Sequence, residues 1–422
     1  MNDSKLPEGR LARLARMASL GARTGASLLL SDTGEAAAKS ALEVLGNLRG
    51  LAAKAGQMAS YVDGVVPDAH RDAYEATLRG LRAAAPTSSP EETRATVERE
   101  LGAPISELFA TWEVRPFASA SIGQVHRATL ADGREVAVKV QHPGIDRAIE
   151  SDLKNAGALE GVVSTFAPRE AQSRRTFEEV AARFREELDY GLEADHAELF
   201  TRLHEGDAAV HIPAVIRERS ARRVITTELV RGWSFEEAAA RPEAERRAWA
   251  ETLWRFVFRG TLVGHAFNAD PHPGNYIFHE GGRVTFLDFG CVQRLEAENV
   301  RAARAIHRAA VARDEAAFRE GLREMLSLRG GAWEDFTQGY VRRCFEPLFA
   351  SPFHITRDWV AELTRSVTRV KPVLLSKGSG FVPMKPGMAL MNRLQFGFYS
   401  VLARLDVAVD YAAVERGFLP EA

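Results

Sequence analysis

An Asp-Gly dipeptide stands between two runs of β-period residues, and this pattern constrains the fold more than any other local feature of the chain. Apolar residues recur at the β period over 122–130, and the run 136–140 alternates strictly between valine and other residues. An Asp-Gly pair favours the positive φ angles that the centre of a two-residue hairpin turn requires. The sequence therefore predicts a β-hairpin over about 117–141.

The length and composition of the chain are those of a folded protein with a large core. It has 422 residues, of which 45% are hydrophobic and 27% charged, so wholesale disorder is excluded. At about 150 residues per domain, the length favours two or three structural units. Helices are predicted over 1–110, 145–205 and from 235 onward, with a helix start at Ser89-Pro90 and further short strands at 224–229, 276–278 and 284–287. This order of helices and short strands predicts an α+β fold.

Charge and cysteine content exclude several classes of protein. Lys and Arg total 55 against 57 Asp and Glu, so the net charge is −2 and no basic excess favours nucleic-acid binding. Cys291 and Cys344 form neither a Cys-x-x-Cys pair nor a disulfide framework, which favours a reducing compartment. No signal peptide is recognisable, and no apolar stretch approaches the roughly 18 residues that cross a bilayer. We therefore expect a cytoplasmic protein without a nucleic-acid partner.

The first candidate for chemistry is Lys139, which lies at the end of the alternating run. An amine at this place in a nucleotide-binding sheet contacts the α- and β-phosphates. Taken alone, a lysine here is also typical of a solvated strand edge. The interpretation therefore depends on the residues that follow.

Two later segments complete a kinase-type set. Asp270 and Asn275 stand five positions apart in a loop rich in Pro and Gly, as do the proton-accepting Asp and the Mg²⁺-binding Asn of kinase catalytic loops. An ordinary turn has a similar composition. Asp288 begins an Asp-Phe-Gly tripeptide after an apolar strand, where a carboxylate is placed to bind Mg²⁺ on nucleotide phosphates. The order Lys139, Asp270, Asn275, Asp288 predicts a site for nucleotide and Mg²⁺.

With these residues the chain resembles the UbiB/AarF family of atypical kinases, also called coenzyme-Q kinase-like proteins, over about 45–295. The resemblance implies a protein-kinase-like fold of two lobes, with a small sheet in the N-lobe and helices in the C-lobe. Four further stretches carry it: Lys54-Ala-Gly-Gln57, Ala118 to Val125, Glu187-Leu-Asp189-Tyr190 and Asn268 to Asn275. The implied domains are a helical extension (1–110), an N-lobe with a helical insertion (111–230), a C-lobe (231–345) and a helical C-terminal tail (346–422).

The resemblance assigns the lysine and the strand that follows it to nucleotide binding. Lys139 contacts the phosphates and takes part in catalysis, and a helix glutamate pairs with it. Our choice for that partner is Glu193, and the alternative is Glu187. Glu228 lies near the end of the strand at 224–229, where a kinase hinge offers backbone groups to the adenine. The alternative is that Glu228 is simply a solvent-exposed residue at a strand end.

The resemblance also implies roles in the later loops. Asp270 holds the position of the catalytic base, and Asn275 and Asp288 hold Mg²⁺. His272 is expected to be a structural, hydrogen-bonding member of the loop rather than a zinc ligand, because no Cys joins it. Cys291 is expected to be buried as a small hydrophobic residue.

An alanine- and serine-rich loop takes the place of the glycine-rich phosphate cover of ordinary protein kinases. Each Cβ narrows the allowed φ and ψ and blocks the closest backbone approach to a phosphate. The resemblance implies an altered nucleotide preference, so ATP and ADP are both candidates. A small-residue turn entering a strand is the alternative interpretation. The nucleotide-binding residues expected here are Ala118, Ser119, Ala120, Ser121 and Val125.

Lys54 and Gln57 stand three apart and share one face of a helix. The resemblance implies that this helix folds over the active site, where Lys54 meets Glu187 or Asp189 and occupies the space of a protein substrate. No Ala-Pro-Glu motif follows the Asp-Phe-Gly tripeptide, so the usual platform for protein substrates is not recognisable.

The leading hypothesis is an atypical kinase or ATPase that binds ATP or ADP with Mg²⁺ and acts on a small molecule or lipid. The resemblance alone links it to isoprenoid-quinone (ubiquinone) metabolism. The alternative is a pseudokinase that binds nucleotide and recruits partners without phosphoryl transfer, and an ordinary protein kinase is least favoured. The amphipathic stretch Leu390 to Val407 either packs on the C-lobe, which is the commoner fate, or makes peripheral contact with a membrane.

Overall fold

The computed structural model describes residues 88–120, 122–151, 153, 181–182, 185–367, 373, 380–382 and 388–419, with the side chains of 367 and 388–396 left aside. Most of the predicted helical extension over 1–110 lies outside these residues. So do three of the predicted site residues, Lys54, Gln57 and Ser121.

Five strands of the described chain form one antiparallel sheet, in the order β1-β3-β4-β6 with β2 paired to β3. The predicted hairpin is confirmed as β3 and β4, whose register runs from Gly123 opposite Gln141 to Thr129 opposite Glu135. Gly133 has a φ of 85° in the connecting turn. The bounds are β1 Thr111–Trp112, β2 Ala118–Ser119, β3 Gly123–Thr129, β4 Glu135–Gln141 and β6 Val224–Glu228.

The helix α5 (Pro90–Leu101) packs against this sheet together with α6 (Ile105–Leu108). The Ser89-Pro90 start predicted from the sequence is confirmed, because Ser89 and Glu92 form a capping box. A buried glutamine of β3 fastens the helix to the sheet: the Gln124 side chain donates to Thr93 Oγ1 at 2.8 Å and accepts from the Ser88 N–H at 3.0 Å. These bonds satisfy polar groups in a mostly apolar contact.

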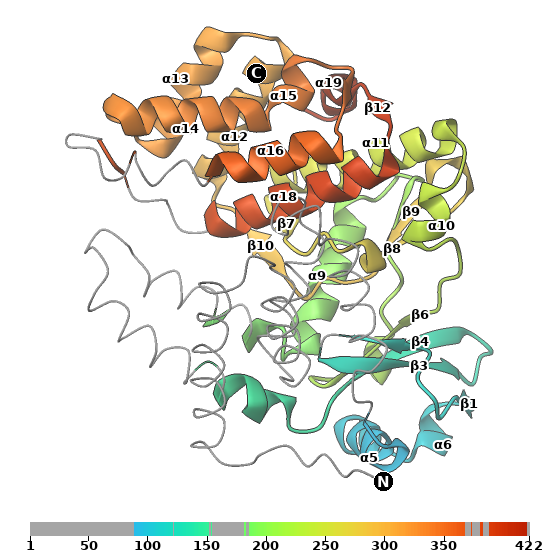
Figure 1. Ribbon diagram of the computed structural model, residues 1–422. Helices are drawn as coiled ribbons and strands as arrows, with labels where there is room; N and C mark the ends of the chain where they lie inside the picture. The colour runs from blue at the N-terminus through green and yellow to red at the C-terminus, as the bar shows by residue number, and fades with distance from the viewer. Residues whose placement is uncertain are drawn as a thin grey trace, which may run out of the picture.

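The helix α9 (Tyr190–Leu203) connects the sheet to the helical part of the protein, as Figure 1 shows. Asp189 caps it by accepting from the Gly191 N–H at 2.9 Å. Near its start, Ala194 packs in a cluster with Ile225 of β6. Near its end, Phe200 belongs to the core of the helical region. One helix therefore ties the two parts together.

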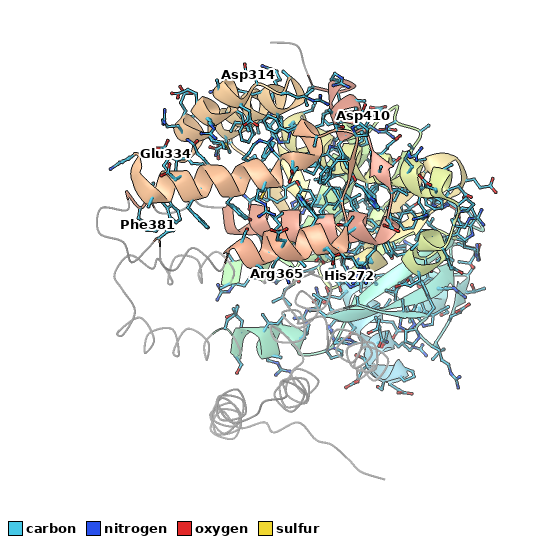
Figure 2. All side chains as sticks on the ribbon, turned by 45° about the horizontal axis from the view of Figure 1, so that its top comes forward. His272, Asp314, Glu334, Arg365, Phe381 and Asp410 are labelled. Atoms are coloured by element: carbon cyan, nitrogen blue, oxygen red, sulfur yellow. The ribbon has the colours of Figure 1, made fainter. Side chains whose placement is uncertain are left out.

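The helical region contains most of the remaining elements and lies above the sheet in the view of Figure 1. Helix starts are capped by side chains such as those of Asp314 and Asp410, both labelled in Figure 2. Its helices are α10 Phe235–Ala239, α11 Glu243–Leu262, α12 Ala297–Val311, α13 Glu315–Leu326, α14 Gly331–Cys344, α15 Glu346–Phe349, α16 Arg357–Val367, α18 Met388–Leu405 and α19 Tyr411–Arg416. Its short strands are β5 Val210–His211, β7 Ala266–Asn268, β8 Tyr276–Phe278, β9 Val284–Phe286, β10 Val292–Arg294, β11 Phe353–His354 and β12 Ala408–Val409.

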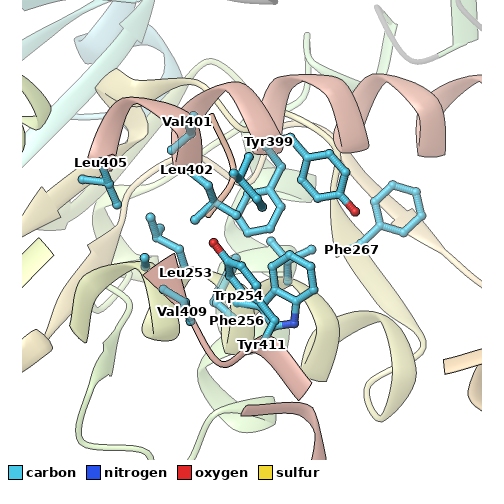
Figure 3. Packing of buried hydrophobic residues seen from close by; sticks show 14 of the residues in the cluster. Leu253, Trp254, Phe256, Phe267, Tyr399, Val401, Leu402, Leu405, Val409 and Tyr411 are labelled. Atoms are coloured by element: carbon cyan, nitrogen blue, oxygen red, sulfur yellow. The ribbon is translucent and has the colours of Figure 1, made fainter. Parts of the chain in front are cut away.

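Trp254 of α11 lies in the centre of one large apolar core, and Figure 3 shows it among Tyr399, Leu402 and Tyr411. Its ring centroid is 4.2 Å from that of Tyr411, and its indole N–H donates to the buried carboxylate of Glu415 at 3.0 Å. The same core contains residues of both segments predicted as separate, 231–345 and 346–422.

The described side chains of α18 are packed in this core. Phe398, Leu402 and Leu405 are almost fully buried there. For the described part of the amphipathic stretch Leu390 to Val407, this packing in the core agrees with what the sequence favoured. In the part of the chain that the structure describes, no helix combines the length and the apolar character needed to cross a membrane.

Candidate active site

Lys139 lies on β4 with its amine enclosed by two carboxylates. Its Nζ is 2.8 Å from Glu193 Oε1, 3.0 Å from Glu193 Oε2 and 3.2 Å from Asp288 Oδ2. It also lies 4.9 Å from the ring centre of Tyr190. Of the two glutamates considered from the sequence, Glu193 therefore contacts the lysine. Glu187 is buried nearby, where a Cβ added at Gly290 would lie 3.9 Å from its Cγ.

The charges of this group depend on one another. Burial disfavours the ammonium, but the carboxylates of Asp288 and Glu193 outweigh it and hold the pKa of Lys139 well above its usual 10.5. Burial raises the pKa of Glu193 to about 7, against the opposing effect of the Lys139 ammonium. Lys139 is therefore cationic throughout the physiological range.

The Asp-Phe-Gly segment is fixed at two points. Asp288 Oδ1 accepts from the Gly290 N–H at 2.9 Å, which leaves Oδ2 toward Lys139. His196 Nδ1 donates to the Phe289 carbonyl at 3.1 Å. Burial lowers the pKa of His196, so the neutral ring acts as this donor. Because Glu193 and His196 stand three apart on α9, one helix face positions both the lysine and the tripeptide.

The loop after β7 is joined to the same tripeptide by an asparagine side chain. Asn268 Oδ1 accepts from the Asp270 N–H at 3.1 Å, and its Nδ2 donates to the Asp288 carbonyl at 2.5 Å. Asn275 Nδ2 donates to the Asp270 carbonyl at 3.1 Å. His272 Nδ1 accepts from the Gly274 N–H at 2.9 Å, a structural bond within the loop. The two loops are therefore one hydrogen-bonded unit.

Several of these groups line a cleft of about 400 Å³, a size typical of small-molecule sites. Lys139 and Glu193 border it together with Asp288 of the neighbouring segment. Asp189 is instead the cap of α9, and neither it nor Glu187 lines the cleft. The other predicted residues found on its wall are Ala118, Ser119, Ala120, Val125, Glu228, Asp270 and Asn275.

Part of the lining of the cleft is apolar. Phe117 is 43% exposed there, with the guanidinium of Arg127 4.8 Å above its ring. Ile277 and Leu287 also contribute to the wall. A flat, uncharged ring such as a purine fits such a surface by stacking and apolar contact.

The strand end at Glu228 is less open than a hinge interpretation assumes. Its N–H donates to the Ala214 carbonyl at 2.9 Å, and its carboxylate lies 3.4 Å from His211 Nε2. The neighbouring Leu229 and Val230 line the cleft as well. The Leu229 N–H donates to the Glu135 carbonyl at 3.1 Å, so neither the Glu228 nor the Leu229 N–H is left for a base.

The sequence interpretation missed three residues of this site. Asn268 was assigned no role, although it stands two positions before Asp270. His196 was not named, although its position three residues after Glu193 places it on the same face of the helix. Phe117 was not named either, although it directly precedes the Ala-Ser loop. Sequence spacing was the available signal in each case.

Two side chains present oxygen atoms suited to Mg²⁺ on the wall of the cleft. Asp288 offers a carboxylate, and Asn275 offers an amide oxygen because its Nδ2 is bonded to the Asp270 carbonyl. Among the described residues, no group of three or more His, Cys, Asp or Glu side chains is placed to hold a metal. Mg²⁺ commonly uses only one or two protein ligands and takes the rest from phosphates and water. The residues present therefore fit Mg²⁺ with nucleotide rather than a metal held by protein alone.

Comparison with known proteins gives consistent matches. Residues 80–322 match the family model of the ABC1 atypical kinase-like domain. The mitochondrial atypical kinase COQ8B of Rattus norvegicus is 28% identical over 397 residues, which cover 88% of this chain and 74% of that protein. An uncharacterized protein of Mycobacterium tuberculosis is 36% identical over 239 residues, or 54% of this chain and 48% of that protein. The aligned segment thus spans about half of the mycobacterial relative.

A solved structure is similar over nearly the whole length. The Rv3197–erythromycin complex from Mycobacterium tuberculosis superposes with a TM-score of 0.65 at 25% identity, covering 97% of this chain and 99% of that one. The fold of the described region is thus shared with a solved protein. The family model itself covers more than half of the chain. This chain therefore belongs to the ABC1 atypical kinase-like family.

Proposed function

We propose that the chain binds ATP or ADP together with Mg²⁺ in the 400 Å³ cleft and acts as an atypical kinase or ATPase of the UbiB type. The observation that carries this proposal is the position of Lys139, which contacts both Glu193 and Asp288 on the wall of that cleft. In this proposal the antiparallel sheet with α9 is the N-lobe, and the helical region is the C-lobe.

Each residue has a part in the proposed reaction. Lys139 neutralises phosphate charge and is held in place by Glu193. Asp270 accepts the proton of the attacking hydroxyl or water, while Asn268 fixes its loop against the Asp288 carbonyl. Asn275 and Asp288 hold Mg²⁺, which neutralises charge on the phosphates when bound. Leu229, Val230 and the other apolar side chains of the cleft take the base.

We propose a small molecule or lipid as the phosphoryl acceptor, with a link to isoprenoid-quinone metabolism. Three facts support this choice: the sequence lacks an Ala-Pro-Glu motif, the relatives include COQ8B, and the similar solved structure is a complex with erythromycin, a small molecule. A lipid acceptor requires contact with a membrane, and we propose a cytoplasmic protein that makes this contact peripherally. Closure of the cleft by the Lys54–Gln57 segment stays a prediction.

The first experiment is thermal unfolding with Mg²⁺ and either ATP or ADP. Binding to the native state stabilises it by about 2.7 kcal/mol at nucleotide concentrations of about 100 times Kd. We expect a Mg²⁺-dependent rise in Tm for the wild type and its loss in Asp288→Asn. Asp195→Asn is the matched control, because Asp195 is an exposed residue that pairs with Arg217.

Turnover then separates the enzyme from the pseudokinase alternative. We expect ATP hydrolysis that depends on Asp270 and is stimulated by lipid or small-molecule acceptors. Nucleotide binding without hydrolysis across a panel of such acceptors would favour the pseudokinase. A Tm that neither nucleotide changes would contradict both.

A further inference from the structure

We propose that a second cavity, between α10, α11, α16 and α18, binds a phosphate group. This cavity has a volume of about 600 Å³ and shares no lining residue with the cleft that contains Lys139. Figure 1 shows α16 and α18 side by side. Its described wall carries a concentration of arginines: Arg241, Arg246, Arg357 and Arg404.

The charge on this wall is positive. Asp358 and Asp406 are the acidic side chains among its described lining residues. Asp406 Oδ1 also accepts a hydrogen bond from His354 Nε2 at 2.9 Å. Arg241 has an additional partner in Glu245 outside the wall. Several guanidinium groups around one cavity repel each other, and a bound anion removes that repulsion.

Internal hydrogen bonds hold two of the arginines in place. Arg241 uses Nε and Nη2 on Glu245. Arg246 uses Nε on the Arg241 carbonyl and Nη1 on the Leu405 and Asp406 carbonyls. A guanidinium has five N–H donors, and no described residue bonds to Arg241 Nη1 or Arg246 Nη2. These arginines are thus positioned in advance and retain donors, which lowers the entropy cost of binding an anion.

Arg357 has no such internal role. It is exposed, and no described residue forms a hydrogen bond or ion pair with it. It is the first residue of α16, whose preceding Thr356 accepts from the Trp359 N–H at 3.2 Å. The uncapped N–H groups of this first turn add to the positive potential. Arg404, half-buried in the last turn of α18, completes the wall.

The chemistry of this wall favours phosphate over other anions. Guanidinium groups bind phosphate with paired, charge-assisted hydrogen bonds, and a phosphate dianion accepts hydrogen bonds from several guanidinium groups at once. The same group is offered by free phosphate compounds and by phospholipid headgroups. Structural use of the arginines explains Arg241 and Arg246, but it leaves Arg357 without a function.

The test is a calorimetric titration of the full-length protein with inorganic phosphate. We expect saturable binding that Arg357→Gln weakens about tenfold and that rising NaCl also weakens. Arg301→Gln is the matched control, because Arg301 is exposed on α12 and forms no ion pair with a described residue. Equal phosphate affinity in Arg357→Gln and wild type would overturn the proposal.

Phosphate has a second candidate site at Lys139, so Lys139→Met is measured in parallel. Binding abolished by Lys139→Met and untouched by Arg357→Gln would place the phosphate in the nucleotide cleft and reject the proposal. Arg404→Gln serves as a second variant on the other side of the cavity, with unfolding curves to show that each variant is folded. The expected result is weaker phosphate binding in both arginine variants, with the Arg357-dependent binding retained in Lys139→Met.

Vesicle flotation separates the two sources of phosphate. Phosphatidylcholine vesicles with and without phosphatidic acid are used with the wild type and Arg357→Gln. Flotation that needs both phosphatidic acid and Arg357 assigns the site to a lipid headgroup. Phosphate binding without such flotation assigns it to a soluble phosphate compound. If the protein neither binds phosphate nor floats with the vesicles, the site is rejected.

Discussion

Lys139 and Asp288 are 149 residues apart in the chain, yet Lys139 Nζ and Asp288 Oδ2 are only 3.2 Å apart. This contact joins the sheet to the loop that follows β9. Glu193 on α9 completes it from a third element. Three segments with separate local folds thus meet at one ammonium group.

Glu193→Gln removes one of the two carboxylates that hold Lys139. The ammonium keeps Asp288 as a partner but loses its bonds of 2.8 and 3.0 Å. We expect the Kd for Mg²⁺-nucleotide, measured by calorimetry, to rise about tenfold. Glu198→Gln is the control on the same helix, because its exposed pair with Arg217 contributes little. Equal nucleotide affinity in the two variants would contradict the positioning role.

Asn268→Ala breaks the link between the Asp270 loop and the Asp288 segment. We expect kcat for ATP hydrolysis to fall about 10–100-fold, with the nucleotide Kd nearly unchanged, because Asn268 does not line the cleft. Asn268→Asp keeps the acceptor for the Asp270 N–H but loses the donor to the Asp288 carbonyl, so it should not restore the rate. Asn299→Ala on α12 is the control. A loss of nucleotide affinity without a loss of kcat would contradict the proposal that Asn268 positions the Asp270 loop.

Gly123→Ala tests the close approach of β3 to β4. An added Cβ would lie 2.4 Å from the Val140 carbonyl oxygen and 2.8 Å from the Tyr190 hydroxyl. Backbone must therefore shift, and we expect a loss of about 1–3 kcal/mol in the free energy of unfolding by urea. Gly339→Ala is the contrast: nothing lies within 4 Å of its added Cβ in the exposed middle of α14. That change should stabilise by about 0.5–1 kcal/mol.

His204 gives a pH dependence of stability. It is 4% exposed, and neither ring nitrogen bonds to a described residue. Burial, with the nearby Arg259 charge, lowers its pKa from 6.5 to about 4. Between pH 6.5 and 4 the unfolded chain therefore binds a proton at His204 that the folded protein does not bind. The free energy of unfolding is unaffected by this group above pH 6.5 and falls as the pH decreases toward 4.

The measurement is urea unfolding of wild type and His204→Phe at several pH values from about 7 to 4. The variant keeps an aromatic ring beside Phe200 and Phe256, which stack near His204. We expect the wild type to lose about 3 kcal/mol more than the variant across this range. Parallel curves for the two proteins would show that His204 does not titrate as described.

The sequence predicted those features that depend on local signals. The hairpin at Gly133 follows from a turn dipeptide between alternating runs, and the start of α5 follows from Ser89 and Pro90. The choice between Glu193 and Glu187 as the partner of Lys139 depended instead on how α9 docks, and 54 residues separate Glu193 from Lys139. Spacing alone does not fix such a docking.

Two of the missed residues, Asn268 and His196, share one physical cause. The Asn268 amide has its role only because the Asp288 carbonyl, 20 residues later, lies 2.5 Å away. His196 likewise needs the carbonyl of Phe289. Backbone acceptors leave no residue-specific mark in a sequence, so spacing can place Asn268 and His196 near the site but cannot identify the carbonyls to which they bond.

The core around Trp254 determines which recombinant fragments are usable. A fragment cut to the matched family segment, 80–322, would end inside α13 and lack Tyr399 and Tyr411, whose rings pack on Trp254. The indole and the apolar faces of α11 would then be exposed to water, and such surfaces drive aggregation. The segment that the family model matches is therefore shorter than the segment that folds, and soluble material requires the chain through α19.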